Sequence, residues 1–254
     1  MQALKLKGLS KNFGGLEVLK DISFDLEVGE HAAVIGPNGA GKTTLFNVIS
    51  GALPISSGKL EMFGRDITKA STHQRIQYGL GRSFQITRLF PDLTILDNIL
   101  LALHGTKPSR YHMFRKVVAY DGIMEKAEQL LQQIDLWYLR SKKVKAISYG
   151  DQRKMEIIMS LASDPKLILL DEPTAGLAID EIPSFINTVK ALSGSTTVLL
   201  TSHDMDVVFG LAERVIVLYY GQFIAEGTPE EIQADPKVRE IYLGIEENEG
   251  YAES

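Results

Sequence analysis

The sequence predicts an α/β fold, and three observations support that prediction. Short apolar stretches such as His31–Ile35 and Lys166–Leu170 are typical of buried strands, and they alternate with segments of helical periodicity. A glycine-rich turn follows the first of these strands. Between Thr87 and Ala162 the apolar residues recur mainly at helical spacing. The order therefore predicts one compact chain whose α/β core is interrupted by a helical insertion.

The glycine-rich turn, Gly36–Thr44, contains two glycines separated by four residues and followed by Lys and Thr. Glycines let backbone amides converge on phosphate oxygens, and the dipole of the next helix adds positive potential. Lys42 would place a charge near the β- and γ-phosphates, and Thr43 would offer a hydroxyl to Mg²⁺. The alternative is a turn that only links a strand to a helix. The spacing of the motif, together with the strand before it and the helix after it, disfavours that alternative. The predicted nucleoside triphosphate contacts are Gly36, Asn38, Gly39, Gly41, Lys42, Thr43 and Thr44.

The composition is that of an ordinary globular protein, with 254 residues, 44% of them apolar and 23% charged. The apolar runs are strand-sized and too short to span a bilayer, so any membrane contact is expected to go through a partner. Alternating Leu and Lys residues in Met1–Ser10 favour a strand over a signal peptide. The net charge of −5 disfavours a nucleic-acid surface, and the lack of cysteine excludes disulfides and thiolate metal sites.

Further strands are predicted at both ends of the chain. Residues 3–28 read as two strands of a small antiparallel unit, and Gly58–Gly64 reads as a third strand bounded by glycines. Near the other end, Thr196–Thr201 is a predicted strand. Val215–Tyr220 and Gln222–Glu226 are expected to pair around the glycine between them.

The strand Leu167–Leu170 is followed directly by Asp171 and Glu172. Packing alone does not explain a buried strand that ends in acid, because an unpaired buried carboxylate is costly. Beside a phosphate loop, Asp171 is expected to hold Mg²⁺ through water, and Glu172 to polarise the attacking water. A helix cap or a turn residue is the alternative for either acid.

Several separate stretches together resemble the ATP-binding subunits of ABC transporters over nearly the whole chain. In the family's order these are Gly36–Thr44, Gln85, Ile147–Arg153, Leu167–Thr174 and Ser202–Asp204. The specific part is the signature stretch Ile147–Arg153 followed shortly by an apolar strand and Asp-Glu-Pro-Thr. The resemblance implies a P-loop core of ABC type with an antiparallel β subdomain and a helical subdomain, and ATP with Mg²⁺ as its ligands. It implies a single domain, 1–254, with residues 1–86 and 163–254 in the nucleotide-binding lobe and 87–162 in the helical lobe.

The resemblance also implies roles for residues outside the phosphate loop. Ser148 and Gly150 open the helix predicted over Asp151–Ala162, and its amides would bind the γ-phosphate held by an opposing subunit. Two subunits would thus enclose two ATP molecules. Taken alone, Ser148 would be an ordinary helix cap.

Three more single residues gain an expected role from the resemblance. Gln85 matches the position that touches Mg²⁺ or water and links the site to the helical lobe. His203 matches the histidine that contacts the γ-phosphate and the catalytic carboxylate; the alternative is a structural histidine. Phe13 matches the aromatic that stacks on adenine; the alternative is a core position. The predicted catalytic residues are Glu172, His203 and Gln85, and the predicted metal-binding residues are Thr43, Gln85 and Asp171.

The sequence departs from the family pattern at several positions. Ile147, Tyr149 and Asp151 stand where the family most often has Leu, Gly and Gln. Asp151 is expected to face solvent or the partner, since a carboxylate is unfavourable beside bound phosphate. Ala178 replaces the usual Asp or Asn, which removes a side chain expected to reach across the dimer.

Four stretches resemble the branched-chain amino-acid uptake subfamily: Gly79–Gln85, Arg88–Phe90, Ala225–Ile232 and Ile241–Gly244. Similar subunits serve short-chain amides and urea, and the ATPase of the lipopolysaccharide exporter has the same type of ending. The resemblance implies a peripheral protein on the cytoplasmic face of the membrane. Its implied partners are integral membrane subunits, a second ATP-binding subunit in a homodimer or heterodimer and, indirectly, a periplasmic or extracellular substrate-binding protein. No nucleic acid is expected.

The preferred interpretation is a transport motor whose segment Gln85 to Asn98 docks the membrane subunits. Within that segment Leu89, Phe90, Leu93 and Ile95 are either docking residues or core. One alternative is a soluble ABC-type ATPase in translation or DNA repair, which would usually carry two cassettes or a coiled-coil insertion. Another is a small-molecule kinase, which would leave the signature unexplained.

Overall fold

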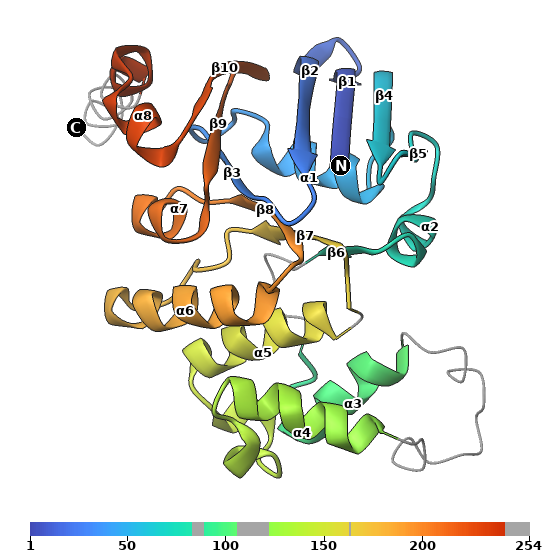
Figure 1. Ribbon diagram of the computed structural model, residues 1–254, viewed down its shortest axis with the longest axis vertical. Helices are drawn as coiled ribbons and strands as arrows, with labels where there is room; N and C mark the ends of the chain where they lie inside the picture. Colours follow the sequence, from blue (N-terminus) through green and yellow to red (C-terminus); the bar gives the residue numbers. More distant parts are fainter. Residues whose placement is uncertain (83–88, 106–121, 163, 242–254) are drawn as a thin grey trace.

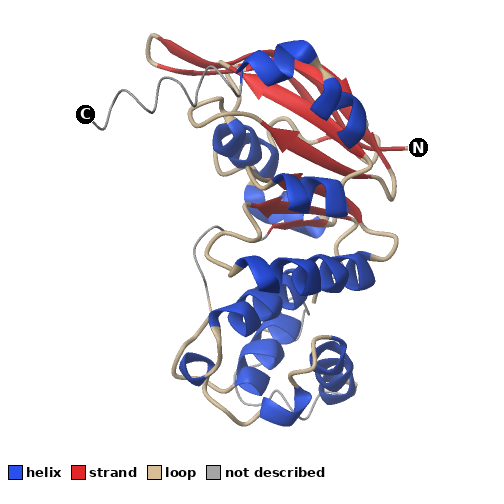
Figure 2. Cartoon of the chain, turned by 90° about the vertical axis from the view of Figure 1, so that its left-hand side faces the viewer, coloured by secondary structure: helices blue, strands red, loops and turns tan. Residues whose placement is uncertain are grey.

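The structure is a computed structural model that describes residues 1–82, 89–105, 122–162 and 164–241. One lobe contains two β-sheets with their helices, and the other lobe is built of helices (Figure 1). Figure 2 shows the same division from the side, with the sheets above and the helical lobe below. The predicted α/β fold with antiparallel and helical subdomains is confirmed. The lobe boundaries given above stay a prediction.

The larger sheet has six strands in the order β10-β9-β3-β8-β7-β6. They are β3 (His31–Ile35), β6 (Leu80–Arg82), β7 (Leu167–Asp171), β8 (Thr197–Thr201), β9 (Arg214–Tyr219) and β10 (Gln222–Gly227). From β9 to β6 the neighbours pair in parallel, and β10 pairs with β9 antiparallel. Every residue of β7 and β8 is buried, as expected for parallel strands covered on both faces. The carboxyl ends of β3, β7 and β8 therefore meet at one edge of the sheet.

The smaller sheet is antiparallel, in the order β2-β1-β4-β5. It consists of β1 (Gln2–Phe13), β2 (Leu16–Glu27), β4 (Ser57–Met62) and β5 (Arg65–Asp66). A single core joins this sheet, helix α1 (Lys42–Ser50) and one face of the larger sheet; Leu6, Phe46 and Leu169 represent the three parts. Burial of this apolar surface fixes the position of α1 against the strands.

The opposite face of the larger sheet is covered by helices α6 (Ile182–Ser193), α7 (Met205–Leu211) and α8 (Pro229–Ala234). Phe185 of α6 and Val207 of α7 lie in the core on this face. Thr228 caps α8 with its side chain, and the proline at the first position fits a helix start.

The helical lobe contains α3 (Ile95–Gly105), α4 (Ile123–Gln133) and α5 (Tyr149–Leu161). Helix α5 belongs to both lobes, because Met155 and Ile158 lie in the helical core while Ile157 and Leu161 lie in the core of the larger sheet. It begins two residues before the predicted start, since Ser148 caps it. Two short 3₁₀ turns, η3 (Trp137–Leu139) and η4 (Val144–Ala146), lie between α4 and α5, and a third, η5 (Ile179–Glu181), lies between β7 and α6.

The apolar residues of the predicted docking segment divide into two sets. Leu89 and Ile95 are buried in the core of the helical lobe. Phe90 is 54% exposed and Leu93 is 37% exposed, so these two are available to a partner. In the parts of the chain that the structure describes, no helix is long and apolar enough to cross a membrane.

Helix α2 (Thr72–Gln77) carries a buried arginine that stabilises the end of α1. Arg75 is 2% exposed and donates through Nη1 to the carbonyl oxygens of Val48 and Ile49, the latter at 2.7 Å. Its Nε donates to the carbonyl oxygen of Ala70 at 3.0 Å. The side chain thus supplies charged donors to the last carbonyls of α1; that of Val48 also accepts from the Gly51 amide at 3.1 Å.

We expect Arg75→Met to lower the free energy of unfolding by about 2–4 kcal/mol, because it removes charged side-chain donors from several carbonyl groups. Urea unfolding followed by circular dichroism measures this loss. Arg65→Met is the matched control: Arg65 is exposed on β5 with its guanidinium 4.2 Å from the Tyr78 ring, so it should cost about 1 kcal/mol or less. Equal effects of the two substitutions would contradict the assignment.

Candidate functional site

The loop Gly36–Gly41 follows β3, and its shape depends on glycine at both ends. Gly36 has φ +154°, and a Cβ at that position would lie 2.1 Å from the carbonyl oxygen of Leu218 on β9. Gly41 has φ +110°, and a Cβ there would lie 2.9 Å from Leu19 Cδ2. Side chains at either position would force the loop away from the strands beneath it.

Helix α1 begins directly after this loop, and no side chain at Gly41 caps its first amide groups. A helix start of this kind presents backbone donors and positive potential to an anion. Lys42 lies over the loop, where its Nζ donates to the carbonyl oxygens of Gly36 and, at 3.1 Å, Pro37. The remaining predicted contacts are accessible: Asn38, Gly39 and Thr43 are exposed, and Thr44 is half-buried.

Two carboxylates follow β7 in different environments. Asp171 is 3% exposed; its Oδ1 accepts from Thr201 Oγ1 at 2.9 Å and its Oδ2 accepts from Arg82 Nη2 at 3.2 Å. Glu172 has a left-handed backbone with φ +47°, and its amide donates to the carbonyl oxygen of Thr201 at 3.0 Å. Such a conformation is uncommon for a residue with a side chain, and residues of this kind cluster at functional sites.

The Glu172 carboxylate meets the histidine predicted from the sequence. Glu172 Oε2 lies 2.7 Å from His203 Nδ1, just beyond the end of β8. The Glu172 side chain is 13% exposed and that of His203 is 73% exposed. A structural histidine would be enclosed, so this exposure favours the functional interpretation. Burial lowers the pKa of the Lys42 ammonium, while Glu172 and Asp171 act in the opposite direction, which puts the lysine within electrostatic reach of both acids.

The signature stretch contacts the loop that follows Glu172. Ser148 is exposed, and its Oγ accepts from the amide of Asp151 at 3.1 Å, as in an ordinary cap. The hydroxyl of Tyr149 donates to the carbonyl oxygen of Ala175 at 3.1 Å, and Arg153 Nη2 donates to the same oxygen at 3.0 Å. Tyr149, which stands where the family most often has glycine, therefore joins α5 to the loop that follows Glu172.

The first turn of α5 is also closely packed. Gly150 is buried, and a Cβ there would lie 2.4 Å from Glu181 Oε1. Asp151 is half-buried and Ala178 is exposed. Phe13, at the end of β1, is 46% exposed with Lys11 Nζ 4.9 Å from its ring centre, so it is not a core residue.

Sequence reasoning missed two contacts of Asp171. Thr201 and Arg82 hold its two oxygens, yet each looks like an unremarkable polar residue at the end of a strand. Parallel strands whose ends share an edge are the signal that could have suggested them. Gln85 lies outside the described residues.

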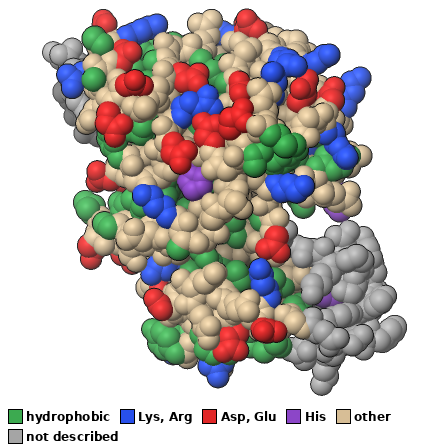
Figure 3. Space-filling view, viewed as in Figure 1, with side chains coloured by type: hydrophobic (Ala, Val, Ile, Leu, Met, Phe, Trp, Pro, Cys, Tyr) green, Lys and Arg blue, Asp and Glu red, His purple; other side chains and the backbone are tan. Residues whose placement is uncertain are grey.

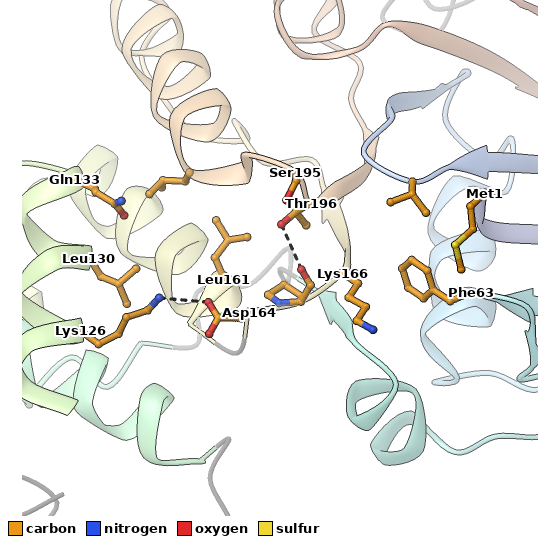
Figure 4. A pocket seen from close by; sticks show the side chains of 13 residues that line it. Met1, Phe63, Lys126, Leu130, Gln133, Leu161, Asp164, Lys166, Ser195 and Thr196 are labelled. Atoms are coloured by element: carbon orange, nitrogen blue, oxygen red, sulfur yellow. Dashed lines mark hydrogen bonds and ion pairs between the residues drawn. The ribbon is translucent and has the colours of Figure 1, made fainter. Parts of the chain in front are cut away.

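The crevice in Figure 4 is separate from this site. It opens between α4, the loop before β7 and the smaller sheet, and is lined by Lys126, Asp164, Phe63 and others. Lys126 Nζ lies 3.3 Å from Asp164 Oδ1 across it. None of the predicted site residues lines it.

We expect Gly36→Ala to lower the free energy of unfolding by about 2–4 kcal/mol and to remove nucleotide binding, because the new methyl group would displace the loop from β9. Chemical denaturation and equilibrium binding of a fluorescent ATP analogue measure the two effects. Gly14→Ala is the control, since Gly14 also has a positive φ, +58°, but no atom within 4 Å of the position that a Cβ would take. It should cost about 1–2 kcal/mol and leave binding unchanged; a fully active Gly36→Ala protein would show that the close approach is unimportant.

The fold and the site define a P-loop nucleotide-binding protein with a helical lobe. The model for the family described as ABC transporter matches residues 19–175, and the one described as branched-chain amino acid ATP-binding cassette transporter matches residues 224–248. The chain is 35% identical over 248 residues to the high-affinity branched-chain amino acid transport ATP-binding protein LivG of Salmonella typhimurium, covering 95% of this chain and 97% of that protein. It is 32% identical over 251 residues to BraF of Pseudomonas aeruginosa, which has the same description; the match covers 95% of this chain and 97% of that protein.

Solved structures similar to this chain are ATP-binding cassettes as well. An ATP-binding cassette of an ABC transporter in its ADP conformation superposes with a TM-score of 0.85 at 32% identity, covering 96% of this chain and 99% of that one. A dimeric cassette in a post-hydrolysis state bound to ADP and Pi superposes with a TM-score of 0.74 at 25% identity, covering 89% and 98%. The chain belongs to the ATP-binding subunits of ABC transporters, and it is an ATPase of that family.

Proposed function

We propose that this chain powers the import of branched-chain amino acids or a similar small solute by binding and hydrolysing ATP between two ATP-binding subunits. The observation that carries the proposal is the meeting of the phosphate loop, Asp171, Glu172 and His203 at the ends of three neighbouring strands. Ser148 is exposed on the other lobe, at the start of α5. In the proposed dimer a second subunit would bring its signature helix to this phosphate loop.

The residues present fit a magnesium site. Mg²⁺ prefers oxygen ligands and is usually held by one or two protein groups together with phosphates and water. Asp171 supplies a carboxylate at the strand end and Thr43 a hydroxyl at the start of α1. When bound, Mg²⁺ would neutralise charge on the phosphate oxygens. Gln85 stays a predicted contributor.

Each side chain has a distinct task in the proposed reaction. Lys42 and the first amides of α1 bind phosphate oxygens. Glu172 accepts a hydrogen bond from the attacking water and polarises it, while His203 holds the carboxylate in place at 2.7 Å. Phe13 offers an exposed ring for stacking on adenine. Ser148 and Gly150 present the α5 amides to the γ-phosphate of the partner subunit.

Substrate and partners are inferred from the relatives. The match at residues 224–248 and the descriptions of LivG and BraF favour branched-chain amino acid uptake over lipopolysaccharide export or a soluble ATPase. Exposed Phe90 and Leu93 would dock integral membrane subunits, which would hold the protein at the cytoplasmic face of the membrane; a substrate-binding protein would act from the other side. On the face in Figure 3, acidic and basic side chains are interspersed over the nucleotide-binding lobe, a pattern that suits solvent better than nucleic acid.

We expect Glu172→Gln to block hydrolysis while keeping ATP binding, and so to hold the ATP-bound dimer together. The mass in solution should double when ATP and Mg²⁺ are added. Adding Ser148→Arg should abolish the doubling, because the long cation would obstruct the helix start that meets the partner's phosphate. A monomer under all conditions, despite tight ATP binding, would contradict a homodimer and require a different partner subunit.

A transport measurement tests the substrate. In cells that depend on this protein, Lys42→Ala should reduce uptake of labelled leucine, isoleucine and valine at least about tenfold, since phosphate binding is lost. Lys154→Ala, a half-buried lysine later in α5, is the control and should leave uptake near its original level. Unchanged uptake in the Lys42→Ala cells would overturn the proposed substrate class.

A further inference from the structure

Arg82 lies at the end of β6 and connects two elements of the site. Its Nη2 donates to Asp171 Oδ2 at 3.2 Å, and its Nη1 donates to Asn47 Oδ1 at 2.8 Å and to Ser50 Oγ at 2.7 Å. Asn47 and Ser50 belong to α1, the helix that begins at Lys42. One guanidinium group therefore joins the helix of the phosphate loop to the carboxylate that ends β7.

This arrangement leaves Asp171 little freedom. The Arg82 side chain is 12% exposed and that of Asp171 is 3% exposed, so the ion pair is largely shielded from water. The second carboxylate oxygen accepts from Thr201. A planar guanidinium can reach several acceptors in fixed directions, which a flexible ammonium group cannot. The carboxylate is thus held from two sides in one orientation.

We propose that Arg82 is a positioning residue for the magnesium ion: through Asp171 it sets the direction of the carboxylate relative to Thr43 at the start of α1. This inference rests on the proposed function, in which Asp171 holds Mg²⁺ through water. Groups that orient metal ligands without touching the metal commonly change metal affinity or activity by about 10- to 100-fold when they are altered. The effect of Arg82 should accordingly appear in the dependence on Mg²⁺, and ATP binding without the metal should change little.

A purely structural role makes a different prediction. If Arg82 only joined β6, β7 and α1, its replacement would lower stability and weaken all nucleotide binding alike. If it orients Asp171, the concentration of Mg²⁺ needed for half-maximal effect rises while metal-free binding of ATP is kept.

The test uses full-length protein carrying Glu172→Gln, so that no hydrolysis occurs during measurement. Binding of a fluorescent ATP analogue is titrated in EDTA and at increasing Mg²⁺ for the parent, for Arg82→Lys and for Arg82→Gln. We expect Arg82→Lys to raise the half-maximal Mg²⁺ concentration about tenfold, with binding in EDTA within about twofold of the parent. Arg82→Gln should shift it at least as far. Thermal unfolding is recorded for each variant.

Two controls separate the possible outcomes. Arg75→Met removes another buried arginine that contacts α1 but has no contact with Asp171, and it should lower stability without moving the Mg²⁺ dependence. Asp171→Asn tests the proposed metal site itself: no change in its Mg²⁺ dependence would overturn the proposed function. If Asp171→Asn shifts the dependence and neither Arg82 variant does, the positioning role is wrong. Failure of both Arg82 variants to fold would likewise assign Arg82 to the fold alone.

Discussion

The site depends on the register between β7 and β8. Because Asp171 pairs with Thr201 in that register, the hydroxyl of one strand faces the buried carboxylate of the other. The amide of the next residue, Glu172, donates to the carbonyl oxygen of the same threonine, and the Glu172 side chain lies against His203. A slip of one residue would exchange the faces of the whole strand and bury Glu172 in the core. The apolar runs that lock the register thus also determine which acid is enclosed and which reaches the open edge.

Helix α5 makes the two lobes mechanically dependent on each other. Its apolar residues lie in both cores, so the helical lobe cannot move as a body without displacing this helix against the sheet. Its first turn holds the Ala175 carbonyl through Tyr149 and Arg153, and the Ala175 amide donates to the carbonyl oxygen of Glu172 at 3.1 Å. A displacement of the signature helix is therefore transmitted over a few bonds to the backbone of the proposed catalytic acid.

The sequence was sufficient to predict the fold class and the order of most strands and helices along the chain, and it also predicted the stretches that carry the proposed site. Glycine spacing predicted the phosphate loop, and a buried strand ending in acid predicted the roles of Asp171 and Glu172, because both patterns are local. The contacts of Arg82 and Tyr149 are not local: each joins segments more than twenty residues apart through a side-chain direction that no periodicity encodes. The sequence also could not predict which apolar side chains of the docking segment are buried. Neighbouring Leu89 and Phe90 look alike in sequence, yet one is in the core and the other is exposed.

The departures from the family pattern can be understood together. Gly176 has φ +83°, and a Cβ there would lie 2.9 Å from Tyr149 Cε1, so the tyrosine ring occupies space that only a glycine leaves open. Ala178 lies just beyond on the same loop and offers no polar group, and Ile179 beside it is 85% exposed. In this chain the loop is therefore held from its own subunit by Tyr149, and in the proposed dimer it would present an apolar rather than a charged side chain to the second subunit.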